Sequence, residues 1–87
     1  MSQPQITIYT TPWCGYCRRA RKLLQEKNLV FTEIDIEGDG DLRGEMMTRS
    51  QRDTVPQIFI GEQHVGGCEE LDALARSGEL DRITQGD

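Results

Sequence analysis

The sequence is poor in the residues and segments on which secreted and membrane proteins depend. Its 87 residues include three cysteines, one histidine, three prolines and no apolar run of membrane-spanning length. Three cysteines are too few, and odd in number, for the disulfide framework of a secreted domain. The N-terminal stretch also lacks the charged and long apolar regions of a signal peptide. We therefore expect one cytoplasmic domain, residues 1–87, with no membrane partner.

Acidic residues are nearly absent from the first third of the chain, where only Glu26 precedes residue 30, although the net charge is −5. An acidic protein is a poor match for a polyanion, so we expect no nucleic-acid partner. Half of the ten basic residues cluster instead in one segment, at Arg18, Arg19, Arg21, Lys22 and Lys27. This basic segment directly follows a Cys-x-x-Cys motif.

The hydrophobic pattern predicts alternating strands and helices. The expected elements, in chain order, are a strand from residue 6 that ends before Thr11, a helix at 15–27, a strand at 29–36, a turn at 38–40, a helix to about residue 49, hairpin strands at 57–60 and 64–66, a helix ended by Gly78, and one further turn at 79–83. This β-α-β-α-β-β-α order predicts an α/β fold with a four-stranded mixed sheet flanked by helices.

The two cysteines of the motif occupy different positions relative to the first predicted helix. Cys14 lies at the helix start, where free backbone N–H groups and the helix dipole favour a thiolate over a thiol. Cys17 lies one turn further on and shares the apolar face with Ala20 and Leu24, so we expect it to be shielded. This arrangement predicts that Cys14 attacks a disulfide and that Cys17 resolves the product by forming a Cys14–Cys17 disulfide.

A structural zinc site is the main alternative from the residues alone. A Cys-x-x-Cys pair is often half of such a site, and His64 and Cys68 complete a set of three cysteines and one histidine. Zinc-binding pairs usually lie in tight hairpins, however, whereas this pair begins a strongly periodic helix. The sequence therefore favours redox chemistry, with no metal, and a small semi-buried role for Cys68.

Four motifs together resemble the glutaredoxin family, in order and in spacing. They are Tyr9-Thr10, Cys14-Gly15-Tyr16-Cys17, Thr54-Val55-Pro56 and Gly66-Gly67-Cys68-Glu69. The resemblance extends from about residue 6 to 83 and is strongest with the small dithiol glutaredoxins of bacteria. It implies a thioredoxin-like fold and an oxidoreductase that uses glutathione to reduce protein disulfides and glutathione mixed disulfides.

The resemblance also implies a glutathione-binding set. The residues are Tyr16, Arg43, Thr54, Val55, Pro56, Gly67, Cys68 and Glu69. Val55-Pro56 matches a cis-proline step whose Val55 backbone pairs with the cysteinyl unit. Backbone N–H groups near Cys68 and Glu69 would bind the γ-glutamyl carboxylate, and the Glu69 side chain would bind its ammonium group.

Two positions depart from the family pattern. Thr11 replaces a lysine that often binds the glycine carboxylate, which leaves Arg43 as a cation at a second position where the family places glutamine or a basic residue. Gly15 replaces the usual proline, and relatives with a small residue there can hold a [2Fe–2S] cluster between two protomers, through the first cysteine of each and bound glutathione. We expect a monomer, and a dimer only if such a cluster is bound.

Overall fold

Four strands form one mixed sheet in the computed structural model, which describes residues 3–85. They are β1 (Ile6–Thr10), β2 (Thr32–Asp35), β3 (Gln57–Ile60) and β4 (Gln63–Gly66), in the order β2-β1-β3-β4. β1 pairs in parallel with β2 and antiparallel with β3, and β3 pairs antiparallel with β4. The predicted mixed sheet is therefore confirmed, whereas residues 1–2 and 86–87 of the predicted domain lie outside the described residues.

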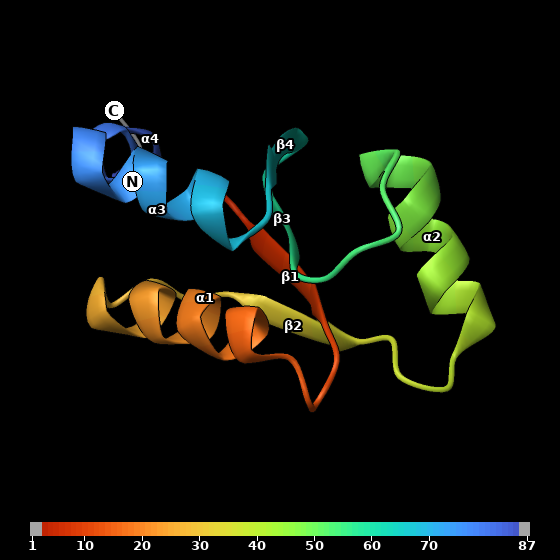
Figure 1. Ribbon diagram of the computed structural model, residues 1–87. Helices are drawn as coiled ribbons and strands as arrows, with labels where there is room; N and C mark the ends of the chain where they lie inside the picture. The colour runs from red at the N-terminus through yellow and green to blue at the C-terminus, as the bar shows by residue number, and fades with distance from the viewer. Residues whose placement is uncertain (1–2, 86–87) are drawn as a thin grey trace.

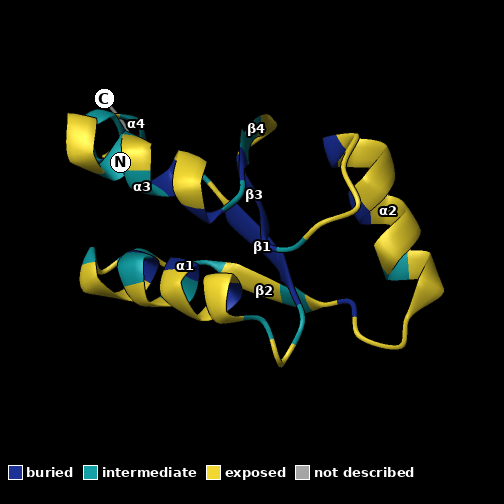
Figure 2. Ribbon diagram, in the orientation of Figure 1, coloured by how far each residue is buried: buried dark blue, intermediate teal, exposed yellow. Residues whose placement is uncertain are grey.

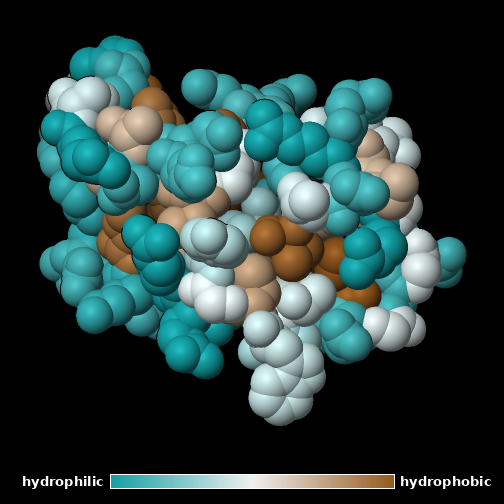
Figure 3. All heavy atoms as spheres, viewed as in Figure 1, coloured by the Kyte–Doolittle hydropathy of each residue, from teal (hydrophilic) through white to brown (hydrophobic). Residues whose placement is uncertain are grey.

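Helices cover both faces of this sheet. Helices α1 (Gly15–Glu26) and α3 (Cys68–Ser77) lie on one side, and α2 (Gly40–Ser50) lies on the other (Figure 1). The central strands β1 and β3 are consequently buried along their whole length (Figure 2). Strands that are covered on both faces are mostly apolar. β1 (ITIYT) and β3 (QIFI) fit this rule, with Thr7, Thr10 and Gln57 as their buried polar residues. Hydrophilic side chains cover most of the face shown in Figure 3.

The two faces have separate cores because successive side chains of a strand point in opposite directions. Ile6 and Ile8 of β1 join the first core, with Ala20, Leu24, Ile58, Ile60, Cys68, Leu71 and Leu80. Tyr9 joins the second core beneath α2, with Ile36, Met46 and Phe59. The Tyr9 hydroxyl donates to Glu45 (2.5 Å) and accepts from Arg49 (2.7 Å), so α2 is also held by polar contacts.

The second strand is shorter than predicted, because it begins at Thr32 and not at residue 29. Asn28 has a positive φ of 58°, and the Leu29 N–H donates to the Leu24 carbonyl, so Leu29 completes the end of α1. The backbone of Val30 bonds in both directions to the Gln3 side-chain amide instead of to a strand. These local hydrogen bonds replace the ladder that the alternating sequence suggested.

The helix boundaries follow the prediction closely, and the clearest difference is at the start of α2. Gly40, predicted in a turn, is the first residue of α2, because the Asp39 side chain caps this helix by accepting from the Leu42 N–H (3.0 Å). The further helical turn predicted at 79–83 is present as a separate short helix, α4 (Glu79–Thr84). Gly78 permits this break because its φ is +85°. Across residues 3–85, every helix is too short or too polar to cross a bilayer.

Adjacent methionines of α2 provide a matched test of this packing. Met46 is fully buried, whereas Met47 is 43% exposed. Met46→Ala should lower the free energy of unfolding by about 2–5 kcal/mol, because it removes apolar contacts and leaves a cavity. Met47→Ala should lower it by less than about 1 kcal/mol. Urea unfolding of both variants measures the difference, and equal losses would contradict the assigned face of α2.

Candidate active site

Cys14 is the N-cap residue of α1. Its Sγ accepts a hydrogen bond from the Cys17 backbone N–H (3.0 Å), and its backbone is extended, with φ −94° and ψ 114°. The Cys14 thiol also donates to the Val55 carbonyl (3.7 Å), which lies in the loop before β3. The sulfur is partly exposed. A hydrogen-bond donor aimed at the sulfur from a helix N-terminus stabilises a thiolate.

Cys17 differs from Cys14 in burial and in protonation. Its side chain is fully buried in α1, and all three cysteines of the chain are free thiols. The pKa of Cys17 is raised to about 12, mainly by burial and also by a side-chain hydrogen bond with Cys14, whereas the nearby Thr11 backbone acts in the opposite direction. At neutral pH Cys17 is therefore a thiol held beside the Cys14 sulfur. Burial also raises the pKa of Cys68.

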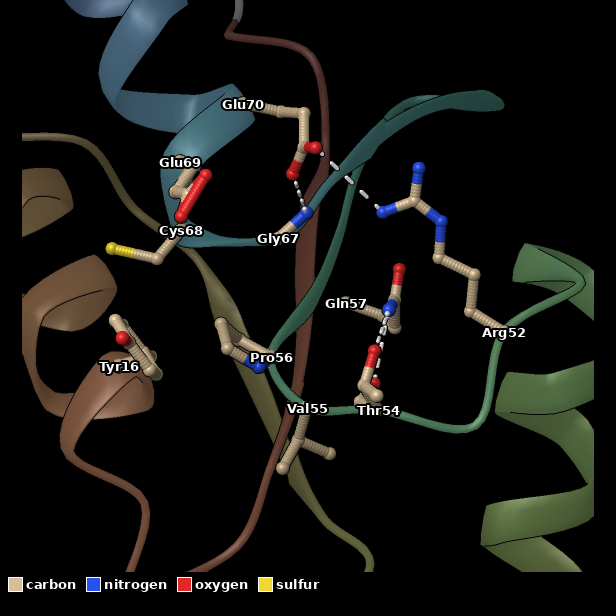
Figure 4. A pocket seen from close by; sticks show the side chains of 10 residues that line it. All are labelled: Tyr16, Arg52, Thr54, Val55, Pro56, Gln57, Gly67, Cys68, Glu69 and Glu70. Carbon is tan, nitrogen blue, oxygen red and sulfur yellow. Dashed lines mark hydrogen bonds and ion pairs between the residues drawn. The ribbon is translucent and has the colours of Figure 1, made fainter.

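A cleft of about 230 Å³ lies between the start of α3, the loop before β3 and the first turn of α1. Figure 4 shows the residues that line it, which come from these three segments and from the first residue of β3. The lining residues are Tyr16, Arg52, Thr54, Val55, Pro56, Gln57, Gly67, Cys68, Glu69 and Glu70. Since the Val55 carbonyl contacts Cys14, the cleft borders the partly exposed Cys14 sulfur.

Seven of the eight residues in the predicted binding set line this cleft, and Arg43 is the exception. The Val55–Pro56 peptide bond is cis, in agreement with the sequence prediction. Arg43 lies on α2, where its Nη1 donates to the Asp53 carbonyl (3.4 Å). The structure therefore does not bring Arg43 to the cleft, because Arg43 lies in the first turn of α2, whereas the loop that lines the cleft follows the last turn of this helix.

The start of α3 depends on a carboxylate that the sequence analysis passed over. Glu70 accepts from the Gly67 N–H (2.7 Å), which is the contact of a capping box. That hydrogen bond is the main reason why the pKa of Glu70 is lowered. Gly66 has φ +121°, and a Cβ there would lie 2.9 Å from the Glu70 carboxylate, so glycine is required at this position. The first N–H groups of α3 then remain free of intrahelical acceptors at the cleft.

Two further residues of the cleft were missed at the sequence level. Arg52 reaches the cleft because Gln51 ends α2 in a left-handed conformation, with φ 61°, and redirects the chain. Its guanidinium lies 3.8 Å from the Glu70 carboxylate. Gln57 lies in β3 and is 1% exposed. No local motif marks Arg52, whereas Gln57 is a polar residue at the start of a buried strand, which is itself a signal.

The set of residues considered for zinc does not come together. The His64 ring packs on Phe59 (5.0 Å between centroids), and its Nε2 lies 2.8 Å from Gln57 Oε1. Among residues 3–85 no three His, Cys, Asp or Glu side chains converge as a metal site. The geometry therefore gives no support to the zinc alternative.

The raised pKa of Cys17 predicts a loss of stability in alkali. Above the ordinary thiol pKa of about 8.5 the unfolded chain releases this proton, whereas the folded chain keeps it up to about pH 12. The unfolded state then binds fewer protons, so the free energy of unfolding falls with rising pH, by up to about 1.4 kcal/mol per pH unit.

Urea unfolding at about pH 8 and about pH 10.5 measures this effect. Cys17→Ala removes the titrating group and keeps a small apolar side chain, so its stability should fall less steeply than that of the wild type. An identical pH dependence in both proteins would contradict the assigned state of Cys17.

Comparison with known proteins agrees with this site. The glutaredoxin family model matches residues 6–65. A glutaredoxin of Pseudomonas aeruginosa is 52% identical over 80 residues, which cover 92% of this chain and 95% of that protein. The solution structure of glutaredoxin from Brucella melitensis is 49% identical, with a TM-score of 0.84 over 100% of this chain and 96% of that chain. A buckwheat glutaredoxin–glutathione complex is 27% identical, with a TM-score of 0.85 over 95% and 77%.

These similarities extend over nearly the whole chain and confirm the thioredoxin-like α/β fold expected from the sequence. The Cys-Gly-Tyr-Cys segment begins a helix beside a cis-proline, with one partly exposed and one buried thiol. The chain therefore belongs to the glutaredoxin family of thiol–disulfide oxidoreductases.

Proposed function

We propose that this glutaredoxin reduces glutathione mixed disulfides and protein disulfides, with Cys14 as the nucleophile, Cys17 as the resolving thiol and glutathione as the reductant. The observation that carries the proposal is the hydrogen bond from the Cys17 N–H to Cys14 Sγ at the edge of the cleft. It stabilises negative charge on the one sulfur that is partly exposed, while the second sulfur of the motif stays protonated and buried.

The chemistry follows from these two states. The Cys14 thiolate attacks the glutathionyl sulfur of a mixed disulfide, and the substrate leaves as a thiolate that takes a proton from water. A free glutathione thiolate can then attack the glutathionyl sulfur of the Cys14 adduct, which yields oxidised glutathione and restores the Cys14 thiolate.

Protein disulfides require the second thiol. After Cys14 has formed a mixed disulfide with the protein, Cys17 loses its proton and attacks the Cys14 sulfur, so that the protein leaves as a thiolate. Two glutathione molecules then reduce the Cys14–Cys17 disulfide and leave as oxidised glutathione. Burial raises the pKa of Cys17, so its deprotonation costs free energy in this route.

The cleft supplies complementary groups for glutathione. The Val55 backbone next to the cis-proline can pair with the cysteinyl unit, as a one-residue strand addition. The first N–H groups of α3 and the Glu69 carboxylate suit the carboxylate and ammonium of the γ-glutamyl unit. Arg52 is the cation of the cleft lining, so we assign it to a carboxylate of glutathione in place of Arg43. The fold is shared with a glutaredoxin that was crystallised with glutathione.

Cluster binding is the second candidate. Cys14 is the partly exposed thiol of the described chain, and a Cβ added to Gly15 would meet no atom within 4 Å, so the loop beside Cys14 is uncrowded. A [2Fe–2S] cluster would take Cys14 from each of two protomers together with glutathione thiolates. Iron, acid-labile sulfide and molecular mass after anaerobic reconstitution distinguish this dimer from the monomeric reductase. The monomeric state and the cytoplasmic location stay predictions.

Two serine variants test the proposed division of labour. Cys14→Ser should lose turnover of a glutathionylated peptide, because a hydroxyl is not ionised at neutral pH. Cys17→Ser should retain this activity, since free glutathione resolves the Cys14 adduct, and should lose reduction of protein disulfides. A coupled assay with glutathione reductase measures both reactions. Equal loss in both variants on the glutathionylated peptide would contradict the assigned roles.

The two arginines of this region form a matched pair for glutathione recognition. Arg52→Ala should raise the KM for a glutathionylated peptide about threefold to tenfold, because it removes a charge-assisted hydrogen bond at a partly exposed site. Arg43→Ala removes the same charge outside the cleft and should change KM by less than about twofold. The reverse order of effects would restore Arg43 as the glutathione-binding cation.

A further inference from the structure

A buried glutamine connects the cleft to the hairpin that carries the only histidine. Gln57 follows Pro56 and is 1% exposed. Its Nε2 donates to the Thr54 carbonyl (2.9 Å) and to Thr54 Oγ1 (3.1 Å), as the dashed lines in Figure 4 show. Both amide protons of Gln57 are therefore used to hold one residue of the cleft.

These contacts determine which group donates and which accepts in each hydrogen bond that links Thr54, Gln57 and His64. The Thr54 carbonyl can only accept, so the amide nitrogen of Gln57 must face Thr54 and the amide oxygen must face His64. The distance from His64 Nε2 to this oxygen is 2.8 Å, and an amide oxygen cannot donate. His64 therefore carries a proton on Nε2 and donates it to Gln57.

The surroundings of His64 hold its ring in place. The ring packs on Phe59 at 5.0 Å. Burial lowers the pKa of His64, with a smaller contribution from the positive charge of Arg52 in the same direction. The neutral ring with a proton on Nε2 is thus the form that meets Gln57 at neutral pH.

The order of donors and acceptors also orients the Thr54 hydroxyl. Its oxygen already accepts from Gln57, so the single hydroxyl proton must point away from Gln57. Thr54 lines the cleft, and its hydroxyl can therefore donate to an acceptor oxygen of a molecule bound there. Without Gln57 the hydroxyl would rotate freely and could offer a lone pair in place of the proton.

We propose that His64 and Gln57 are positioning residues, which hold the Thr54 hydroxyl and backbone as preorganised partners for a carbonyl or carboxylate oxygen of glutathione. This inference rests on the proposed function. Gln57 and His64 act through Thr54 and do not touch the reacting sulfurs, so their loss should weaken recognition of glutathione and leave the thiol chemistry intact.

The test compares Gln57→Met, which keeps side-chain length and removes both amide functions, with His64→Phe, which keeps a packed ring without the donor. Gln63→Met, on the exposed start of β4, is the matched control. The readouts are KM and kcat for a glutathionylated peptide, the rate of Cys14 alkylation by iodoacetamide, and the thermal unfolding midpoint. His64→Gln restores a donor and tests rescue.

We expect Gln57→Met and His64→Phe to raise KM about threefold to tenfold, the effect of one lost hydrogen bond. Values of kcat and the alkylation rate should stay within about twofold of wild type, and Gln63→Met should match wild type. His64→Gln should recover most of the KM. Adding Thr54→Val to Gln57→Met should produce no further increase, because both changes remove the same oriented hydroxyl.

Three results would overturn the inference. One is a KM within about twofold of wild type in Gln57→Met and His64→Phe. Another is an additive effect of Thr54→Val. The third is a fall in kcat, alkylation rate and unfolding midpoint together, which would show a structural role alone. A wild-type protein that ignores the glutathionylated peptide but reduces a glutathione-free disulfide would instead refute the proposed function, and the inference with it.

Discussion

The hydrogen bond from the Cys17 N–H to Cys14 Sγ is the contact on which the site depends. It forms only because Cys14 is the residue where the chain leaves an extended conformation and α1 begins, so the first free N–H groups of the helix face its sulfur. The same geometry places the Cys17 side chain on the buried face of α1. One helix start therefore separates a partly exposed sulfur that accepts a backbone hydrogen bond from a buried sulfur that stays protonated.

The sheet holds this helix start against the rest of the cleft. β1 and β3 pair antiparallel, with Tyr9 opposite Gln57, so the loop after β1 and the loop before β3 lie at the same end of the sheet. These loops bring Cys14 to the Val55 carbonyl. Hydrogen-bond donors and acceptors surround the resulting cleft, as the proposed binding of glutathione, a charged tripeptide, requires. They come from the backbone next to the cis-proline, from the start of α3, which Glu70 caps, and from Thr54 and Gln57.

Local sequence signals predicted most elements because strand and helix periodicities differ and glycines mark the ends. They failed for residues 29–31, which were predicted to begin the second strand. There the Val30 backbone bonds to the Gln3 side-chain amide, and the Leu29 N–H donates to Leu24 at the end of α1, so neither joins the sheet. They also failed for Arg43 and Arg52. The sequence pattern gives both residues the same expectation, a solvent-exposed arginine. Only the folded chain distinguishes them, because the left-handed Gln51 at the end of α2 directs Arg52 to the cleft.

The sequence by itself determined the redox motif, its position at a helix start, the order of the elements and the two glycines before Cys68, because these depend on residues that are close in the chain. The tertiary structure alone decided the cation of the cleft, the capping role of Glu70 and the contacts of Gln57 with Thr54 and His64. These contacts join side chains whose approach depends on the path of loops and on sheet register, and no local pattern encodes the distance between segments that meet only in the folded chain.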